Sequence, residues 1–341
     1  MGELIGKGLS PWYANLPLNT ELRSNHQFQS FIMALVNQAE NKKHPNLFIV
    51  GAPKCGTTAM YTYLQQHPEV FMSPVKEPYY FGNDMIFYRL QRKTQAEYLT
   101  LFGAARDEKV LGEASVTYLA STSAAEEIYA FNRSAKIIIM LRNPVEMVHS
   151  LHSQLLFTET EDIANFEAAL QAEEDRKLLK RIPPRCTIVN FLYYREFATY
   201  APQVTRYLHR FNSNQVKIII YDDLKADTKK TYCDTLRFLG VNSSLEPEEY
   251  AVVNRNKVKR HQWLRTSLRQ PLVLEIGRRL VSSRTKRQNI AKRFNSLTIQ
   301  HRKRPPMTDE IKTALQEYFL SDVKKLSKML DRDLTHWCKR S

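Results

Sequence analysis

The fold of this chain is decided by residues 47–58, which read LFIVGAPKCGTT. Four apolar residues, 47–50, run directly into a Gly/Pro turn, a pattern typical of a buried parallel strand. The next apolar positions follow a helical spacing, at Met60, Tyr61 and Leu64. The sequence therefore predicts a strand, a tight loop and a helix. Backbone N–H groups and the helix dipole make a loop in this position an anion-binding site.

The loop differs from that of nucleoside-triphosphate P-loops, which read Gly-x-x-x-x-Gly-Lys-Ser/Thr. Gly51 and Gly56 have the required separation, and Thr58 stands at the hydroxyl position. Thr57 occupies the lysine position, however, and the lysine is Lys54, inside the loop. A lysine placed there can reach the oxygen between a phosphate and the group attached to it. The pattern indicates a site for an anionic phosphate group.

The strand expected at residues 136–141 gives no sign of a magnesium site. It ends in Arg142 and not in a carboxylate. Cys55, Cys186, Cys233 and Cys338 are too scattered for a zinc site and form no CxxC pair. No metal is therefore expected.

Three segments together resemble a known family. Residues 53–58 resemble the 5′-phosphosulfate loop of the sulfotransferases that use 3′-phosphoadenosine 5′-phosphosulfate (PAPS). Residues 141–150, LRNPVEMVHS, resemble their 3′-phosphate motif, with Arg142 and Ser150 at the matching positions. Residues 76–81, KEPYYF, resemble the Lys-Glu-Pro segment of the heparan-sulfate-type and bacterial branch, in which the glutamate is the base. Two phosphate motifs in the right order make the resemblance specific.

A fourth segment, residues 112–119, also looks like part of this family. It reads GEASVTYL, and Ala114 stands where some glycan-modifying members carry a lysine. The likeness runs from about Asn46 to Trp337. It implies an α/β, P-loop-like three-layer fold, with a central, mostly parallel sheet flanked by helices on both faces.

The resemblance implies a sulfotransferase of the EC 2.8.2 class. Such an enzyme moves the sulfuryl group of PAPS, in line, to a hydroxyl or amine of a carbohydrate, glycolipid or small-metabolite acceptor. Glu77 is the expected general base, and Lys54 is expected to bind the bridging oxygen and the 5′-phosphate. The other residues expected to bind the nucleotide are Cys55, Gly56, Thr57, Thr58, Arg142, Ser150 and, by a loose match to a loop that closes over it, Arg260. Those expected to contact the acceptor are Lys76, Tyr79 and Ser115.

Several assignments have alternatives. Glu77 could instead be a surface glutamate paired with Lys76. Cys55, at a helix N-terminus, could be acidified and reactive, although a small residue filling a tight loop is the simpler interpretation. His149 and His152 are rival bases, because another branch of the family uses histidine, but a structural role on their helix is favoured.

Two other functions compete with sulfuryl transfer. A P-loop kinase or other phosphotransferase would require ATP and magnesium, against which the displaced Lys54 and the Arg142–Ser150 pair argue. A non-enzymatic binder of polyanions would use residues 255–304. That segment holds sixteen Lys or Arg and one acid, Glu275, so it carries the entire net charge of +15. It could meet an anionic glycan or a membrane surface, or be a solvated basic face; no nucleic-acid partner is expected.

Composition adds an expectation about location. No apolar run reaches 18 residues, and residues 1–17 lack the pattern of a secretory signal. Position 6 is Gly6, so myristoylation is not expected. Animal glycan sulfotransferases usually carry a membrane anchor, so these absences favour a soluble, cytoplasmic, bacterial-type enzyme.

The chain divides into an N-terminal helical arm, 1–44, and a single domain, 45–341. The remaining expected strands are 70–72, 110–112, 136–141 and 216–221. The expected helices are 124–131, one beginning at Pro144, 159–180, 193–211, 231–239 and an amphipathic pair over 307–337.

Overall fold

The computed structural model of the 341-residue chain describes residues 43–88, 90–250, 257–259, 299–301 and 304–339. The expected arm at 1–44 falls almost entirely outside these ranges, as do Arg260 and most of the basic segment 255–304. These expectations stay predictions. The described residues from His44 onward belong to one compact unit, which contains the elements below.

A five-stranded sheet in the order β2-β3-β1-β4-β5 forms the centre of this unit. All four of its strand pairings are parallel, as predicted. The strand that precedes the loop is central, and the strand that ends before Arg142 is its neighbour. The strands are β1 (Leu47–Gly51), β2 (Val70–Met72), β3 (Val110–Ala114), β4 (Lys136–Leu141) and β5 (Val216–Ile220).

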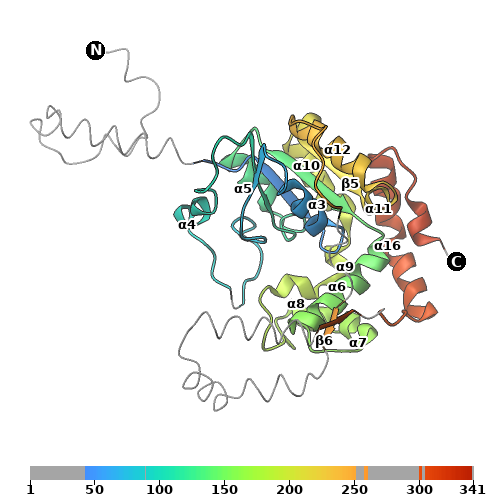
Figure 1. The fold of residues 1–341 in the computed structure, drawn as a ribbon. Coiled ribbons are helices and arrows are strands. Elements are labelled where there is room, and N and C mark those ends of the chain that lie inside the picture. Colours follow the sequence, from blue (N-terminus) through green and yellow to red (C-terminus); the bar gives the residue numbers. More distant parts are fainter. Residues whose placement is uncertain (1–42, 89, 251–256, 260–298, 302–303, 340–341) are drawn as a thin grey trace, which may run out of the picture. The chain divides into compact units, whose positions relative to one another are not determined.

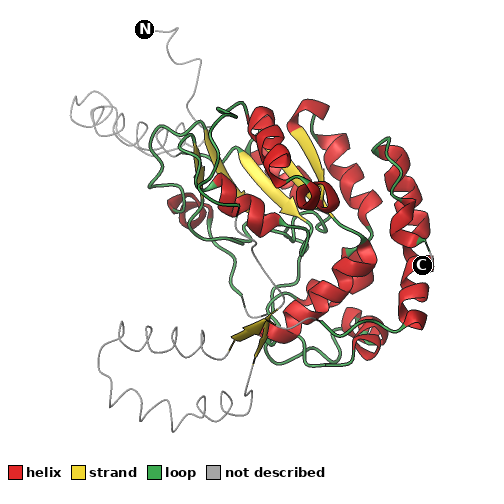
Figure 2. Cartoon of the chain, turned by 45° about the vertical axis from the view of Figure 1, so that its right-hand side comes forward, coloured by secondary structure: helices red, strands yellow, loops and turns green. Residues whose placement is uncertain are grey.

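Helices cover both faces of the sheet, giving the three-layer α/β arrangement (Figures 1 and 2). Because both faces are covered, the central strands are uniformly apolar instead of alternating. The helices are α3 (Thr57–Leu64), α4 (Gln95–Thr100), α5 (Ala124–Phe131), α6 (Pro144–Thr158), α7 (Phe166–Gln171), α8 (Glu173–Lys177), α9 (Tyr194–Phe197), α10 (Tyr200–Arg210), α11 (Tyr221–Ala226), α12 (Thr228–Leu239) and α16 (Asp309–Met329). Short 3₁₀ turns occupy Val189–Leu192, Ser213–Gln215 and Thr335–Cys338.

Local sequence signals explain the helices that were predicted well. Pro144 occupies the first turn of α6, where a missing N–H costs nothing, and Asn143 caps it by accepting from the Val145 N–H at 3.0 Å. Gly240 ends α12 in the left-handed conformation, with φ of 75°. The apolar face of α16 is buried along Leu315, Phe319, Val323 and Leu326.

The predicted helix at 159–180 is wrong in its first part. Helix α6 ends at Thr158, because Glu159, its C-cap, has φ of 64°, and the chain is irregular up to Asn165, which caps α7. The reason is the buried carboxylate of Glu161. Arg176 donates to both of its oxygens, at 2.6 and 2.7 Å, and the Tyr194 hydroxyl donates to it at 2.6 Å.

The predicted helix at 193–211 is two helices, α9 and α10. Asp322 of α16 accepts from the backbone N–H groups of Tyr200 and Ala201, at 2.7 and 3.0 Å, and so starts α10 anew. The expected C-terminal helix pair is also corrected: α16 is a full helix, but its partner is a single 3₁₀ turn.

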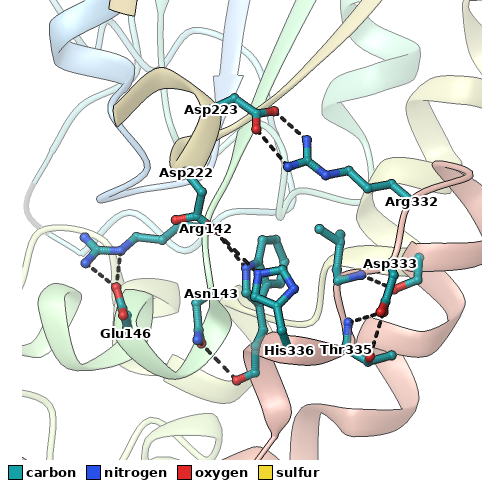
Figure 3. A network of polar contacts seen from close by, with 12 residues as sticks. Arg142, Asn143, Glu146, Asp222, Asp223, Arg332, Asp333, Thr335 and His336 are labelled. Carbon is teal, nitrogen blue, oxygen red and sulfur yellow. Dashed lines mark hydrogen bonds and ion pairs between the residues drawn. The ribbon is translucent and has the colours of Figure 1, made fainter. Parts of the chain in front are cut away.

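Hydrogen bonds and an ion pair hold the residues after α16 beside the carboxyl ends of β4 and β5 (Figure 3). Arg332 donates to both carboxylate oxygens of Asp223, at 2.5 and 2.8 Å, and the Trp337 indole donates to Asp222 at 3.1 Å. The Asn143 amide donates to the Trp337 carbonyl at 3.2 Å. These contacts fix α11 and the start of α6, the two elements next to Arg142.

A two-stranded antiparallel ribbon, β6 (Lys257–Lys259) with β7 (Ile299–His301), contacts α6 through β6. Strand β7, near the end of the basic segment, thus pairs with a strand that contacts the helix carrying Ser150. Among the helices of the described residues, none is both long enough and apolar enough to cross a membrane.

Candidate active site

A cavity of about 590 Å³ opens at the carboxyl ends of β1 and β4, the edge at which open parallel sheets bind ligands. It is formed by the loop after β1, the segments after β2 and β3, helix α6 and the segment before α9. The expected site residues that line it are Lys54, Gly56, Thr57, Thr58, Lys76, Glu77, Tyr79, Arg142 and Ser150. Three separate sequence motifs therefore meet at one place.

The loop fits closely around the start of α3. Gly56 is the N-cap of this helix, with φ of 90°. A Cβ at this position would lie 2.8 Å from Leu224 Cδ2, so only glycine allows this approach. Thr57 is buried, and Thr58 is partly exposed to the cavity. The first backbone N–H groups of α3 and the hydroxyl of Thr58 are thus available to an anion.

Lys54 lies at the wall of the cavity that faces α6. It has φ of 63°, and its Nζ donates to Gln154 Oε1 at 3.1 Å. Gln154 was missed by the sequence interpretation. A signal for it existed: it follows Ser150 by four residues and so lies on the same face of the helix.

Cys55 does not have the properties of a reactive thiol. Its side chain is fully buried, with Sγ 3.3 Å from the Pro53 carbonyl oxygen and 4.0 Å from the Tyr200 hydroxyl. Burial raises its pKa to about 12, against the weaker opposing effect of Arg142. The hypothesis of an acidified cysteine is therefore wrong; Cys55 fills the inside of the loop.

Glu77 reaches the cavity from a segment with unusual backbone angles. It has φ of 62°, and Tyr79 has φ of 52°. The Glu77 carboxylate accepts from the Val116 N–H at 3.0 Å and forms an ion pair with Lys76. Its side chain remains 22% exposed, on the cavity wall. The alternative pairing with Lys76 is thus real, but it occurs inside the cavity and leaves the carboxylate accessible.

Ser115 lies beneath the cavity and not in its wall. It is fully buried; its hydroxyl donates to Glu113 at 2.7 Å and accepts from the Tyr79 N–H at 3.2 Å. The expected contact of Ser115 with the acceptor is therefore wrong. Its side chain instead makes hydrogen bonds within the protein interior. Glu113, which sequence reasoning passed over, is also fully buried. Burial raises its pKa to about 7, against hydrogen bonds from Ser115, Tyr118 and Tyr98, and the charge of Glu77 adds to the rise.

Arg142 and Ser150 line the same end of the cavity, and each has a different hydrogen-bond partner. Arg142 donates to Glu146 Oε2 through Nε at 2.9 Å and Nη2 at 2.5 Å, as Figure 3 shows, and its guanidinium lies 4.8 Å from the centre of the Tyr221 ring. Ser150 Oγ accepts from Arg304 Nη2 at 3.0 Å. Arg304, at the end of the basic segment, was missed by the sequence interpretation.

The two arginines at this end influence each other. Burial and then the positive charge of Arg142 lower the pKa of Arg304, while Glu146 opposes the change. Two guanidinium groups that repel each other favour a bound anion, because the anion relieves their repulsion. The end of the cavity at Ser150 therefore suits a phosphate group. In the described part of the chain, no three His, Cys, Asp or Glu side chains gather as metal ligands would.

The two rival bases lie away from the cavity wall. His149 packs against Phe166, with ring centres 5.0 Å apart, and His152 packs against Phe166 and Tyr194. His152 Nε2 is hydrogen-bonded to the Ile163 carbonyl at 2.9 Å. Neither ring is part of the cavity lining. Burial, then the charges of Arg304 and His152, lower the pKa of His149 to about 4.

This shift predicts a loss of stability in acid. Between pH 6.5 and about 4, His149 is protonated in the unfolded chain but not in the folded one, so the free energy of unfolding falls as pH falls through this window. Between pH 7 and pH 4.5, we expect the free energy of unfolding of His149→Gln to fall by about 2 kcal/mol less than that of the wild type. Urea unfolding at several pH values measures this difference. His209→Gln, at an exposed position, is the control, and parallel curves for wild type and His149→Gln would contradict the prediction.

Comparison with known proteins decides the family. The sulfotransferase domain model matches residues 44–329. This chain belongs to the sulfotransferase domain family. The sulfotransferase of Alicyclobacillus acidocaldarius is 28% identical, with a TM-score of 0.65; the match covers 87% of this chain and all of that one.

Curated sulfotransferases are also similar to the chain. Mouse carbohydrate sulfotransferase 15 is 28% identical over 255 residues, 60% of this chain and 45% of that protein. Mouse bifunctional heparan sulfate N-deacetylase/N-sulfotransferase 4 is 25% identical over 297 residues, 84% of this chain and 30% of that protein. The chain thus spans less than half the length of these curated relatives. The predicted family and fold class are confirmed.

Proposed function

We propose that this chain transfers the sulfuryl group of PAPS to a hydroxyl or amine of a carbohydrate acceptor. The observation that carries the proposal is the meeting of three motifs in one cavity: the Lys54–Thr58 loop, the Lys76–Glu77 segment, and Arg142 with Ser150. The family supports the reaction class, and the names of the relatives favour a carbohydrate over a glycolipid or small-metabolite acceptor.

The residues present fit a nucleotide with phosphates at two positions. The Gly56 turn and the start of α3 would hold the 5′-phosphosulfate, with Lys54 at the bridging oxygen. Arg142, Ser150 and Arg304 would hold the 3′-phosphate, since guanidinium groups match phosphate oxygens. PAPS supplies an activated sulfuryl group on a phosphate that leaves; the protein supplies positions and charges. That this chain uses PAPS, and no metal, is part of the proposal.

Glu77 would accept the proton of the acceptor. Its carboxylate is exposed to the cavity, while the Val116 N–H and Lys76 fix its direction. Lys54 approaches from the opposite motif and would stabilise the negative charge that grows on the leaving phosphate. A base on one side and a cation at the leaving oxygen satisfy the needs of in-line transfer.

The acceptor would occupy the part of the cavity away from Arg142. Its wall holds hydroxyl groups, a guanidinium and an aromatic ring, from Thr158, Thr160, Arg185, Thr187 and Phe191. Arg185 is paired with Glu159. Such a wall suits a polyhydroxylated molecule, whose oxygens both donate and accept hydrogen bonds. Lys76 and Tyr79 complete this side. The proposed roles of residues 255–304 as an anionic-glycan or membrane surface, and a cytoplasmic location, stay predictions.

The donor is tested by calorimetry with 3′-phosphoadenosine 5′-phosphate, and with ATP and magnesium for the kinase alternative. We expect Arg142→Ala to weaken the 3′-phosphorylated nucleotide by roughly tenfold or more, since a charged hydrogen bond is lost, and to leave adenosine 5′-phosphate nearly unchanged. Arg181→Ala, at an exposed surface pair, is the control. Equal losses for the two nucleotides would show that Arg142 does not recognise the 3′-phosphate.

The reaction itself is tested by transfer of labelled sulfate from PAPS to a panel of sugars, polysaccharides, glycolipids and small metabolites. Transfer to carbohydrates is the expected result. Salt-sensitive heparin binding without any transfer, unaffected by loss of Glu77 and Lys54, would favour the polyanion-binding alternative.

A further inference from the structure

Glu113 lies in β3, fully buried beneath the cavity, and takes no direct part in the proposed chemistry. Three hydroxyl groups donate to its carboxylate. Ser115 Oγ lies 2.7 Å from Oε2, while the hydroxyls of Tyr98 and Tyr118 each lie 2.9 Å from Oε1. Burying a carboxylate costs free energy, and three hydrogen-bond donors at one buried carboxylate therefore suggest that Glu113 has a specific role.

Two of these hydroxyls also accept hydrogen bonds from the segment that follows Glu77. The Tyr118 hydroxyl accepts from the N–H groups of Tyr80 and Phe81, at 2.9 and 3.2 Å. Ser115 Oγ accepts from the Tyr79 N–H at 3.2 Å. Backbone N–H groups only donate, so the protons of both hydroxyls are directed to Glu113. The carboxylate thus fixes two acceptors for three consecutive backbone N–H groups.

The segment needs such support because its backbone is strained. Glu77 and Tyr79, on either side of Pro78, both have positive φ, a conformation that non-glycine residues adopt only at an energetic cost. The end of β3 and the residues after it hold Glu77 as well: the Glu77 N–H donates to the Ala114 carbonyl at 2.9 Å, and its carboxylate accepts from the Val116 N–H. Residues 113–118 therefore form one support for residues 77–81.

We infer that Glu113 is a positioning residue, which holds residues 79–81 through Ser115 and Tyr118 and so keeps the Glu77 carboxylate directed into the cavity. This inference rests on the proposed role of Glu77 as the base. It assigns Glu113 no contact with donor or acceptor. Replacing Glu113 by glutamine would put an NH₂ donor opposite hydroxyl donors and so break the arrangement at nearly constant volume.

The chain offers a matched pair of variants. Tyr98→Phe and Tyr118→Phe each remove one buried hydroxyl that donates to Glu113 Oε1 at 2.9 Å, and both keep their rings. Of these two hydroxyls, only that of Tyr118 also accepts hydrogen bonds from residues 77–81. The ring of Tyr98 stacks on Tyr80 with centres 4.2 Å apart, a contact that phenylalanine preserves.

We expect Tyr118→Phe to lower kcat at least tenfold while the Kd for 3′-phosphoadenosine 5′-phosphate stays within twofold. Tyr98→Phe should keep kcat within about twofold, although thermal melting should show a similar loss of stability in both. Glu113→Gln should show the same loss of kcat as Tyr118→Phe. If Glu113→Gln fails to fold, the comparison of the two tyrosine variants alone tests the inference. Equal kcat values for the two tyrosine variants would overturn the inference.

Amide hydrogen exchange separates this inference from the proposed function. Tyr118→Phe should speed exchange at Tyr80 and Phe81 about tenfold, and Tyr98→Phe should not. Amide exchange is measured without turnover. If the protein transfers no sulfuryl group, the proposed function is refuted, but the exchange measurement still tests the positioning of residues 79–81. Unchanged exchange at both amides in Tyr118→Phe would overturn the positioning role even if Glu77→Gln behaves as a base variant.

Discussion

Lys54→Ala should lower kcat by roughly two to three orders of magnitude. Lys54 is the sole cation in the loop 51–58, and its side chain lies on the cavity wall, where it would meet charge growing on the leaving phosphate. Removing such a group typically costs several kcal/mol of transition-state stabilisation, or roughly 10² to 10³ in kcat. Alanine leaves the Gly56 turn and α3 intact, so the fold should survive.

The measurement is the single-turnover rate with saturating PAPS, supported by circular dichroism to confirm folding. Lys225→Ala, at an exposed position on α11, is the control for the loss of one positive charge. Nucleotide affinity should fall as well, because the same ammonium group would contact the 5′-phosphate. Near-normal turnover by Lys54→Ala would show that the loop lysine does not take part in the reaction.

Glu77→Gln should reduce kcat by roughly two to four orders of magnitude, the usual contribution of a positioned base. Glutamine keeps the shape of the side chain, and its amide oxygen can still accept from the Val116 N–H, but it cannot take the proton of the acceptor. Nucleotide affinity should persist, because in the proposed site other motifs would bind the phosphates. The loss should therefore appear in kcat more than in KM.

The histidines supply the comparison for Glu77. His149→Ala and His152→Ala should keep most of their kcat, since both rings pack against Phe166 outside the cavity lining. An acceptor with a weakly acidic hydroxyl should depend on Glu77 more than a free amine does. If Glu77→Gln stays active while a histidine variant loses activity, the base is a histidine and the role given to residues 76–77 is wrong.

The residues of the proposed phosphate-binding half of the site could be located from the sequence because their signals are local. Loop 51–58 lies between a strand and a helix, and Arg142 and Ser150 lie in one strand–helix junction. In each case apolar spacing identifies the flanking elements, and parallel pairing then brings the two junctions to the same edge of the sheet. Strand β4 and helices α5 and α6 begin or end where patterning and the proline at 144 indicate.

The breaks in the predicted helices depended on distant partners. The irregular stretch after α6 follows from the burial of Glu161 by Arg176 and Tyr194, and the start of α10 is set by Asp322, more than 120 positions away. Helical periodicity reports which residues are apolar, but not which polar group will accept a backbone N–H. Tertiary contacts therefore overrode continuous helical patterns at both places.

The sequence by itself determined the sheet, the loop and the motifs that meet at its edge, because apolar periodicity and glycine and proline positions act within a few residues. The tertiary structure alone decided the partners of those motifs. Gln154 reaches Lys54 across 100 positions, and Arg304 reaches Ser150 across 154. Glu113 supports the segment of Glu77 from beneath. Hydrogen bonds between such distant groups exist only once folding has brought them to about 3 Å from each other, and no local pattern encodes that distance.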